Sequence, residues 1–342
     1  MGMTRAQDTA LIRAVTARDL SRVLRILESG ASARSRRERD GWSALHLAAQ
    51  SGDTAIAKLL IDAGAELNAT AVTREVIDRS VQKGSTTPLL LALRERHEEM
   101  ALLLMDRGAA IDPESAPRGE ALHLAVDRGF ERVVTRLLAL TKRPKWKSPL
   151  GGSLLVLAVS LRHTGIVKRL LAAGAPVEPE ALGAACGRGH VALVAMLLEA
   201  GADVNGPSES LVEAASGGQT KMIQWLLKHG AKLEKQGAPA LHMAANNGHV
   251  QTLRYLIRLG VTVNERDEHG WTALMAAAWY GHVEAAKTLL SAGADPSLAT
   301  PEGKTSLQLA RERGHLRLLS ILEVADRKPA PRRLRSKPGA RS

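Results

Sequence analysis

The sequence predicts an all-α solenoid in which pairs of short helices repeat along the chain. Three observations lead to this fold class. A glycine follows a Leu-Leu-like pair at a period near 33 residues, a Gly-His turn or a relative of it recurs with the same period, and the apolar residues are almost all aliphatic. Neither helix of such a pair can bury its apolar face alone, so neighbouring pairs must stack on one another.

The two markers are independent of each other, and their shared period makes coincidence a poor explanation. The first marks the end of each second helix and stands at Gly30, Gly64, Gly108, Gly174, Gly201, Gly230, Gly260 and Gly293, with Thr141 filling the gap after Gly108. The second lies between the two helices of each pair, as in Gly52-Asp53, Gly129-Phe130, Gly189-His190, Gly248-His249, Gly281-His282 and Gly314-His315.

Within each repeat the residue types fit two helices joined by a tight turn. The first helix begins at Thr87-Pro88 or a relative such as Thr272-Ala273, where a hydroxyl caps free amides and a proline at the first helical position loses nothing. Small residues such as Ala48-Ala49 then allow close packing of helices. A glycine supplies a left-handed bend, an apolar second helix follows, and the next glycine ends that helix.

In this pattern the chain resembles the ankyrin-repeat family. The best matches are residues 267–283 (DEHGWTALMAAAWYGHV), 40–52 (DGWSALHLAAQSG) and 237–250 (GAPALHMAANNGHV). We expect about ten repeats over residues 1–323, beginning near residues 7, 38, 82, 115, 148, 175, 204, 234, 267 and 300, with the first and last as caps. The resemblance implies a β-hairpin finger between successive repeats.

The connections depart from the family pattern in two places. Those that follow Gly174, Gly201 and Gly230 are too short for a full finger, so we expect no hairpins between about residues 175 and 240. The connection after Gly64 is eleven residues too long, and its insertion near residues 69–85 includes a segment, 72–81, that we expect to add a helical turn. Such an insertion lies on the binding side of a repeat array or is a tolerated surface loop, and the sequence leaves both open.

Positive charge is concentrated at two places. The net charge is +12, and residues 324–342 hold half of that excess in a Pro/Arg-rich tail that we expect to be disordered. Residues 142–147 (KRPKWK) place four cations around one Trp. The candidate residues for an anionic ligand, such as nucleic acid or an anionic membrane, are therefore Lys142, Arg143, Lys145, Trp146, Lys147, Arg332, Arg333 and Arg335. A solvated loop, a targeting address or a solubilising end are the alternatives.

No residue pattern indicates catalysis, a metal or a cofactor. Nine of the eleven histidines occupy two repeated positions that in the resembled family serve packing and main-chain hydrogen bonds. Cys186, the single cysteine, lies in a stretch of small residues with no activating base. The chain shows neither a secretory signal nor an apolar run long enough to span a membrane, so we expect a monomeric cytoplasmic protein. A bias toward Arg, Ala and Gly favours a bacterial source.

Surface recognition is then the expected function. In the resembled family, partners bind the finger tips and the exposed end of each first helix on the concave face. Carried over, this predicts partner-binding residues Trp42, Gln50, Arg94, Arg128, Arg188, Asn246, Asn247, His269, Trp271, Trp279, Tyr280 and Arg313. Large aromatic residues are common interface anchors, and three of them fall in the ninth repeat. The alternative is that Trp271 only covers the next hairpin and Trp279 packs on its neighbour.

These observations predict a non-enzymatic module or scaffold that binds a protein partner on one rigid face. One alternative is a binder of nucleic acid or another anionic surface assisted by the basic tail. Another is an effector or inhibitor that occludes a partner enzyme, which would use the same face as the first function. No motif identifies the partner.

Overall fold

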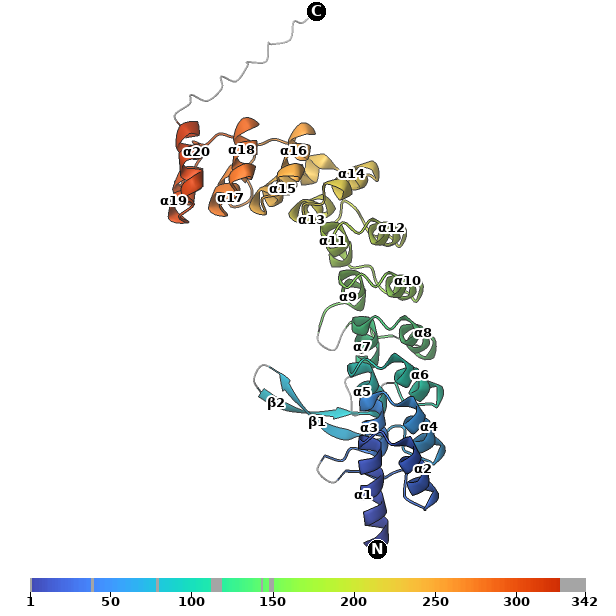
Figure 1. The fold of residues 1–342 in the computed structure, drawn as a ribbon. Coiled ribbons are helices and arrows are strands. Elements are labelled where there is room, and N and C mark those ends of the chain that lie inside the picture. The colour runs from blue at the N-terminus through green and yellow to red at the C-terminus, as the bar shows by residue number, and fades with distance from the viewer. Residues whose placement is uncertain are drawn as a thin grey trace, which may run out of the picture. The chain divides into compact units, whose positions relative to one another are not determined.

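The computed structural model describes residues 2–37, 40–77, 80–111, 119–142, 144–147 and 151–326. The chain divides into two compact units, residues 1–176 and 177–342, which are described separately. Within the described residues there are twenty helices and one two-stranded hairpin, which confirms the predicted all-α solenoid of helix pairs (Figure 1).

The first unit stacks its helices in two layers. One layer holds the first helix of each pair, namely α1 (Gly2–Thr16), α3 (Ala44–Ser51), α5 (Pro88–Arg94), α7 (Glu120–Arg128) and α9 (Leu154–Ser160). The other holds α2 (Leu20–Glu28), α4 (Thr54–Asp62), α6 (Glu98–Asp106), α8 (Glu131–Leu140) and α10 (Thr164–Ala172). Each helix contacts its partner and the next helix of its own layer, so the core lies between the layers (Figure 1).

Side-chain caps define where many of these helices begin. The hydroxyls of Ser43 and Thr87 accept from the amides three residues later, as do the carboxylates of Asp19 and Asp53. The core itself is aliphatic, with fully buried leucines between the layers and alanines such as Ala48 at 0% exposure where first helices approach. The predicted capping and packing roles are therefore confirmed at these positions.

The turn between paired helices needs left-handed backbone at one residue. Glycine supplies it in most repeats, as at Gly52 with φ 70°. In three repeats an arginine stands there instead, and Arg18, Arg96 and Arg162 adopt φ 56°, 67° and 62°. A side chain in this region is strained, because its Cβ approaches the neighbouring carbonyl oxygen. The sequence has Arg-His in place of Gly-His at Arg96-His97 and Arg162-His163. These turns thus keep the left-handed backbone at an energetic cost.

The insertion forms a β-hairpin, and the helical turn expected at residues 72–81 is wrong. Strand β1 (Ala71–Ile77) pairs antiparallel with β2 (Ser80–Thr86), in a register that sets Ala71 opposite Thr86. The segment is rich in Val, Thr and Ile, whose branched side chains favour extended backbone. In Figure 1 the hairpin leaves the unit on the side of the first helices α3 and α5.

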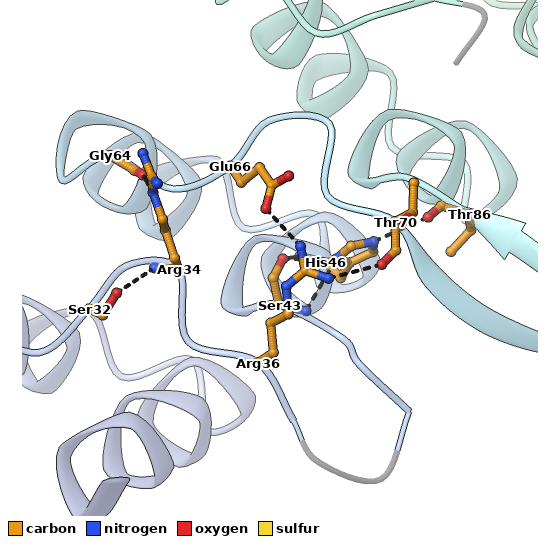
Figure 2. A network of polar contacts seen from close by, with 9 residues as sticks. All are labelled: Ser32, Arg34, Arg36, Ser43, His46, Gly64, Glu66, Thr70 and Thr86. Atoms are coloured by element: carbon orange, nitrogen blue, oxygen red, sulfur yellow. Dashed lines mark hydrogen bonds and ion pairs between the residues drawn. The ribbon is translucent and has the colours of Figure 1, made fainter. Parts of the chain in front are cut away.

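Side chains of the second repeat hold both ends of this hairpin (Figure 2). Arg36 donates to the main-chain oxygen of Thr70, 3.3 Å away, and forms an ion pair with Glu66 at 2.7 Å. His46 donates from Nε2 to the main-chain oxygen of Thr86, 3.3 Å away. One contact lies just before β1 and the other at the last residue of β2, so the base of the hairpin is fixed to the helix layer.

The second unit repeats the two-layer arrangement. Its first helices are α11 (Pro179–Gly187), α13 (Ser210–Ser216), α15 (Leu233–Asn246), α17 (Ala273–Trp279) and α19 (Ser306–Glu312). Their partners are α12 (Val191–Glu199), α14 (Thr220–Lys228), α16 (Val250–Arg258), α18 (Val283–Ser291) and α20 (Leu316–Asp326). Because α20 runs to Asp326, its last three residues belong to the stretch from 324 that we assigned to the tail. The rest of the tail lies outside the described residues.

The connection before α15 differs from the sequence expectation. We expected a short irregular segment after Gly230, but α15 begins at Leu233, so most of this segment is helical, and Pro239 lies in the helix interior. The added turn buries Gln236, whose Oε1 accepts from the amide of Leu211 at 2.8 Å and whose amide donates to the main-chain oxygen of Val204. This amide thus ties the helix to the preceding repeat where a finger is missing.

Short fingers close where the connections have full length. Single antiparallel bridges join Arg36 with Ser43, Lys147 with Ser153, Arg266 with Thr272 and Ala299 with Thr305. Residues 154–265 are all described, and no bridge occurs among them. This agrees with the expectation that the short central connections carry no hairpins.

Candidate partner-binding surface

The ninth repeat places three aromatic side chains around one first helix. Trp271 comes just before α17, Trp279 ends it, and Tyr280 is its C-cap residue. The finger before the helix is fixed by Asp267, whose Oδ1 accepts from the amides of His269 and Trp271 at 3.0 and 2.8 Å. The sequence analysis did not single out Asp267. An acidic residue four positions before Trp271 could have indicated this role, because it can accept hydrogen bonds from the amides of the turn.

The structure brings Trp271, Trp279 and Arg313 into one cluster. The two indole rings meet edge to face with centroids 5.7 Å apart, and the guanidinium carbon of Arg313 lies 4.3 Å from the Trp279 centroid. Both tryptophans are half-buried, whereas Arg313 is exposed and Tyr280 is 50% exposed. The sideways packing that we considered for Trp279 therefore occurs, yet both tryptophans stay partly exposed, with a cation over the ring of Trp279.

Histidines of the following repeats hold the main chain beneath these side chains. His315 donates from Nε2 to the oxygen of Trp279, and His282 donates to the oxygen of Asn246, each at 2.9 Å. Their rings lie against glycines of the preceding turns, where an added Cβ would come within 2.6–2.7 Å of a ring atom. The structural role predicted for the turn histidines is thus confirmed at these two positions.

Polar side chains border the aromatic cluster on both sides. At the end of α15, the C-cap residue Asn247 is exposed and donates from Nδ2 to the main-chain oxygen of Ser216 at 3.0 Å, while Asn246 is half-buried. On the other side, Glu312 forms an ion pair with Lys304 at 2.9 Å. The arrangement is an apolar centre with a polar rim, which is the usual composition of a protein interface.

Comparison with known proteins agrees with this architecture. A family model described as Ankyrin repeats (3 copies) matches residues 2–71, 122–208 and 211–300, well over half of the chain. The chain belongs to the ankyrin-repeat family. Ankyrin repeats generally mediate protein–protein interaction, and the predicted resemblance is confirmed.

Several curated ankyrin-repeat proteins are similar over long stretches. The Ankyrin repeat and KH domain-containing protein mask-1 of Caenorhabditis elegans is 31% identical over 68% of this chain, which spans only 9% of that protein. The mouse B-cell lymphoma 3 protein homolog is 28% identical over 55% of this chain and 47% of its own length. Human Cyclin-dependent kinase inhibitor 2A is 36% identical over 29% of this chain and 69% of its own length.

In the first unit, the predicted partner-binding residues make contacts with other residues of the chain. Trp42 is 8% exposed, with the guanidinium of Arg37 over its ring at 5.2 Å. Arg94 pairs with Glu120 across α5 and α7, and Arg128 donates to the main-chain oxygen of Arg94 at 3.4 Å. Gln50 is exposed, and His97 donates to its main-chain oxygen at 2.9 Å. We therefore leave Trp42 out of the proposed surface.

The remaining candidate residues lie apart from the cluster or are exposed at its edge. Arg188, at the end of α11, and His269, in the ninth finger, are exposed. Lys142, Lys145 and Lys147 are also exposed, while Trp146 is half-buried. The other four candidates for an anionic ligand, Arg143, Arg332, Arg333 and Arg335, lie outside the described residues.

Two titratable side chains, Cys186 and His46, are buried in the repeats, and burial shifts their pKa values. Burial raises the pKa of the Cys186 thiol to about 12, which keeps it protonated at neutral pH. Burial lowers the pKa of His46 to about 4, and its Nδ1 accepts from the amide of Ser43 at 3.2 Å. In the described part of the chain no group of three potential metal ligands gathers, and no helix has the length and apolarity to span a bilayer.

Proposed function

We propose that this ankyrin-repeat chain is a non-enzymatic interaction module that binds a protein partner on the concave face, where the fingers and first-helix ends of its second unit lie. The observation that carries the proposal is the cluster of Trp271, Trp279 and Arg313, with Tyr280 beside it. Rings of this kind with few rotatable bonds dominate binding energy at protein interfaces. Because the main chain beneath Trp279 is held by His315, binding would cost little ordering.

A binding role without catalysis is supported by the use of the histidines. His46, His97, His249, His282 and His315 each donate to a main-chain oxygen of another repeat, and His242 donates to that of Glu265 at the end of its own repeat. A ring fixed in this way contributes to the stacking of repeats, which is the use expected of histidines in a binding scaffold. The proposed action is recognition by one chain, as a monomer in the cytoplasm.

The test is affinity capture with the intact chain and with a triple variant, Trp271→Ala, Trp279→Ala and Tyr280→Ala. We expect the intact chain to retain a discrete partner that the triple variant loses, while circular dichroism shows the same helix content in both. Equal capture by the two chains would contradict the proposed site. A matched control is the substitution of Trp225, which stacks at 3.6 Å on His229, the C-cap residue of its own helix α14.

A second function is supported by the exposed lysines around Trp146. They would bind phosphates of a nucleic acid, with the ring of Trp146 stacking on a base. A salt titration separates the two functions, because binding through phosphate contacts weakens steeply with salt whereas aromatic contacts do not. If the captured partner is an enzyme, occlusion of its active site is the corresponding mechanism, and the name of the human kinase inhibitor similar to this chain points the same way.

A further inference from the structure

Arg313 is the best-placed cation on the proposed surface. Its guanidinium lies against the Trp279 ring at 4.3 Å, so one flat face is covered while the edge of the fork stays open. The side chain is exposed, and within the residues that the structure describes no carboxylate forms an ion pair with it. A guanidinium oriented by an aromatic ring matches a carboxylate through two parallel hydrogen bonds.

The nearby acidic side chains are committed to other groups. Glu312, its neighbour in the chain, pairs with Lys304 at 2.9 Å. Asp267 accepts from two main-chain amides of its finger, and Glu268 lies 3.5 Å from His269. Glu312 is thus neutralised by Lys304 and leaves the charge of Arg313 unpaired beside the aromatic rings, and an acid on the partner would complement that charge.

One helix away, Asn246 offers a polar contact of another kind. Its main-chain oxygen is taken by His282, but its side-chain amide makes no hydrogen bond within the described residues. An amide group has both a donor and an acceptor, and this pair matches the amide and carbonyl of an extended peptide. Helices α15, α17 and α19 are successive neighbours, so Asn246 and Arg313 are separated by two helix spacings, roughly 16–20 Å.

We propose that the ninth-repeat surface binds an extended acidic peptide segment of its partner. A segment of about six residues spans that distance at about 3.3 Å per residue. Its main chain lies on Asn246, an apolar side chain contacts Tyr280 and the edges of the tryptophans, and an Asp or Glu next to that side chain pairs with Arg313. This inference rests on the proposed function and adds the chemistry of the partner.

The packing of the rings favours a peptide over a nucleic acid. Proteins bind single strands by stacking bases on open aromatic faces. Here Arg313 covers one face of Trp279, and Trp271 meets that ring edge to face. Arg313 thus occupies a face of Trp279 on which a base would have to stack, whereas a peptide side chain can contact the rings without displacing this cation.

The experiment is selection of a random dodecapeptide library on the immobilised full chain, followed by anisotropy titration of the recovered peptides. We expect the recovered sequences to carry Asp or Glu within two positions of an apolar residue. We expect Arg313→Gln to weaken their binding at least tenfold, as loss of a charge-assisted pair does. Changing the peptide acid to its amide should weaken binding by the unaltered chain equally, without a further effect in Arg313→Gln.

Two control variants make the outcome unambiguous. Arg254→Gln removes the same charge from an exposed arginine on α16 and should leave affinity unchanged. Arg313→Lys keeps the charge without the planar fork and should restore part of the affinity. Peptides that need Trp279 but not Arg313 would overturn this inference and leave the proposed function standing. Binding of peptides that depends on neither residue, or recovery of no peptide, would contradict both the inference and the proposed function. If a thymidine dodecanucleotide binds more tightly than the peptides and this binding requires Arg313, the inference is also overturned, because the ligand of Arg313 is then a phosphate and not a carboxylate.

Discussion

His315 donates a hydrogen bond from Nε2 to the main-chain oxygen of Trp279, 2.9 Å away, and its ring lies beside Gly281. The same relationship joins His282 to Asn246 and Gly248 one repeat earlier. In each case a residue proposed to contact the partner with its side chain is held by its main chain to the next repeat. Stacking of the repeats and presentation of the surface therefore depend on the same residue.

Replacing His315 with alanine should weaken the junction between the last two repeats. The carbonyl of Trp279 loses its partner and the space beside Gly281 is left unfilled, so we expect the free energy of unfolding to fall by about 1–3 kcal/mol. Urea denaturation followed by circular dichroism measures this. His269→Ala, at an exposed finger histidine, is the control and should be neutral; equal effects of the two would contradict the account.

Glycine substitutions test the turn geometry through a matched pair. Gly248 and Gly293 both have left-handed backbone, but only at Gly248 would a Cβ meet the ring of His282, 2.7 Å away. We expect Gly293→Ala to cost about 1–2 kcal/mol from backbone strain and Gly248→Ala to cost clearly more. Thermal unfolding of both variants checks the order, and a smaller effect at Gly248 would show that the histidine does not hold this junction.

The converse change should stabilise the protein. Arg96 adopts a left-handed φ of 67° that glycine accepts without strain. We expect Arg96→Gly to raise the free energy of unfolding by a few tenths to about 1 kcal/mol, since the strain removed exceeds the added flexibility of the unfolded chain. Urea denaturation gives the value, and destabilisation would mean that the arginine side chain contributes more than its backbone costs.

His46 predicts a defined pH dependence of stability. Burial lowers its pKa to about 4 in the folded chain, and unfolding returns the pKa to the ordinary value of 6.5, so between these values the unfolded chain binds more protons. Stability is complete above pH 6.5 and declines as the pH falls toward 4, by at most about 3 kcal/mol. Urea denaturation across this range should show a shallower decline in His46→Asn than in the unaltered chain. Parallel curves would contradict the assignment.

Much of this fold could be predicted because its signals are local. Hydroxyl caps, turn glycines and Gly-His pairs act within a few residues, and they defined the helix pairs and the role of most histidines. The start of α15 was missed because Gln236 gains two contacts with the preceding repeat. The hairpin β1–β2 was missed because its pairing joins two segments that no repeat pattern constrains.

The residues of the candidate surface were proposed from the sequence, and the structure adds the contacts among them. Trp271, Trp279, Tyr280 and Arg313 were named from repeat positions, whereas the stacking of Arg313 on Trp279 depends on how two repeats pack. Burial of Trp42 has the same origin, because Arg37 folds over its ring. Repeat position nominates candidate residues, and tertiary contacts then decide how much of each side chain remains accessible.

The most direct test of the central claim compares Trp279→Ala with Leu289→Ala, a fully buried position of α18. Calorimetric titration with the recovered partner and urea denaturation are measured on both variants. We expect Trp279→Ala to cost at least about 2 kcal/mol of binding free energy and to destabilise the fold less than Leu289→Ala, which should cost about 2–5 kcal/mol of stability. Unchanged binding in Trp279→Ala, or a fold that tolerates Leu289→Ala but not Trp279→Ala, would contradict the account.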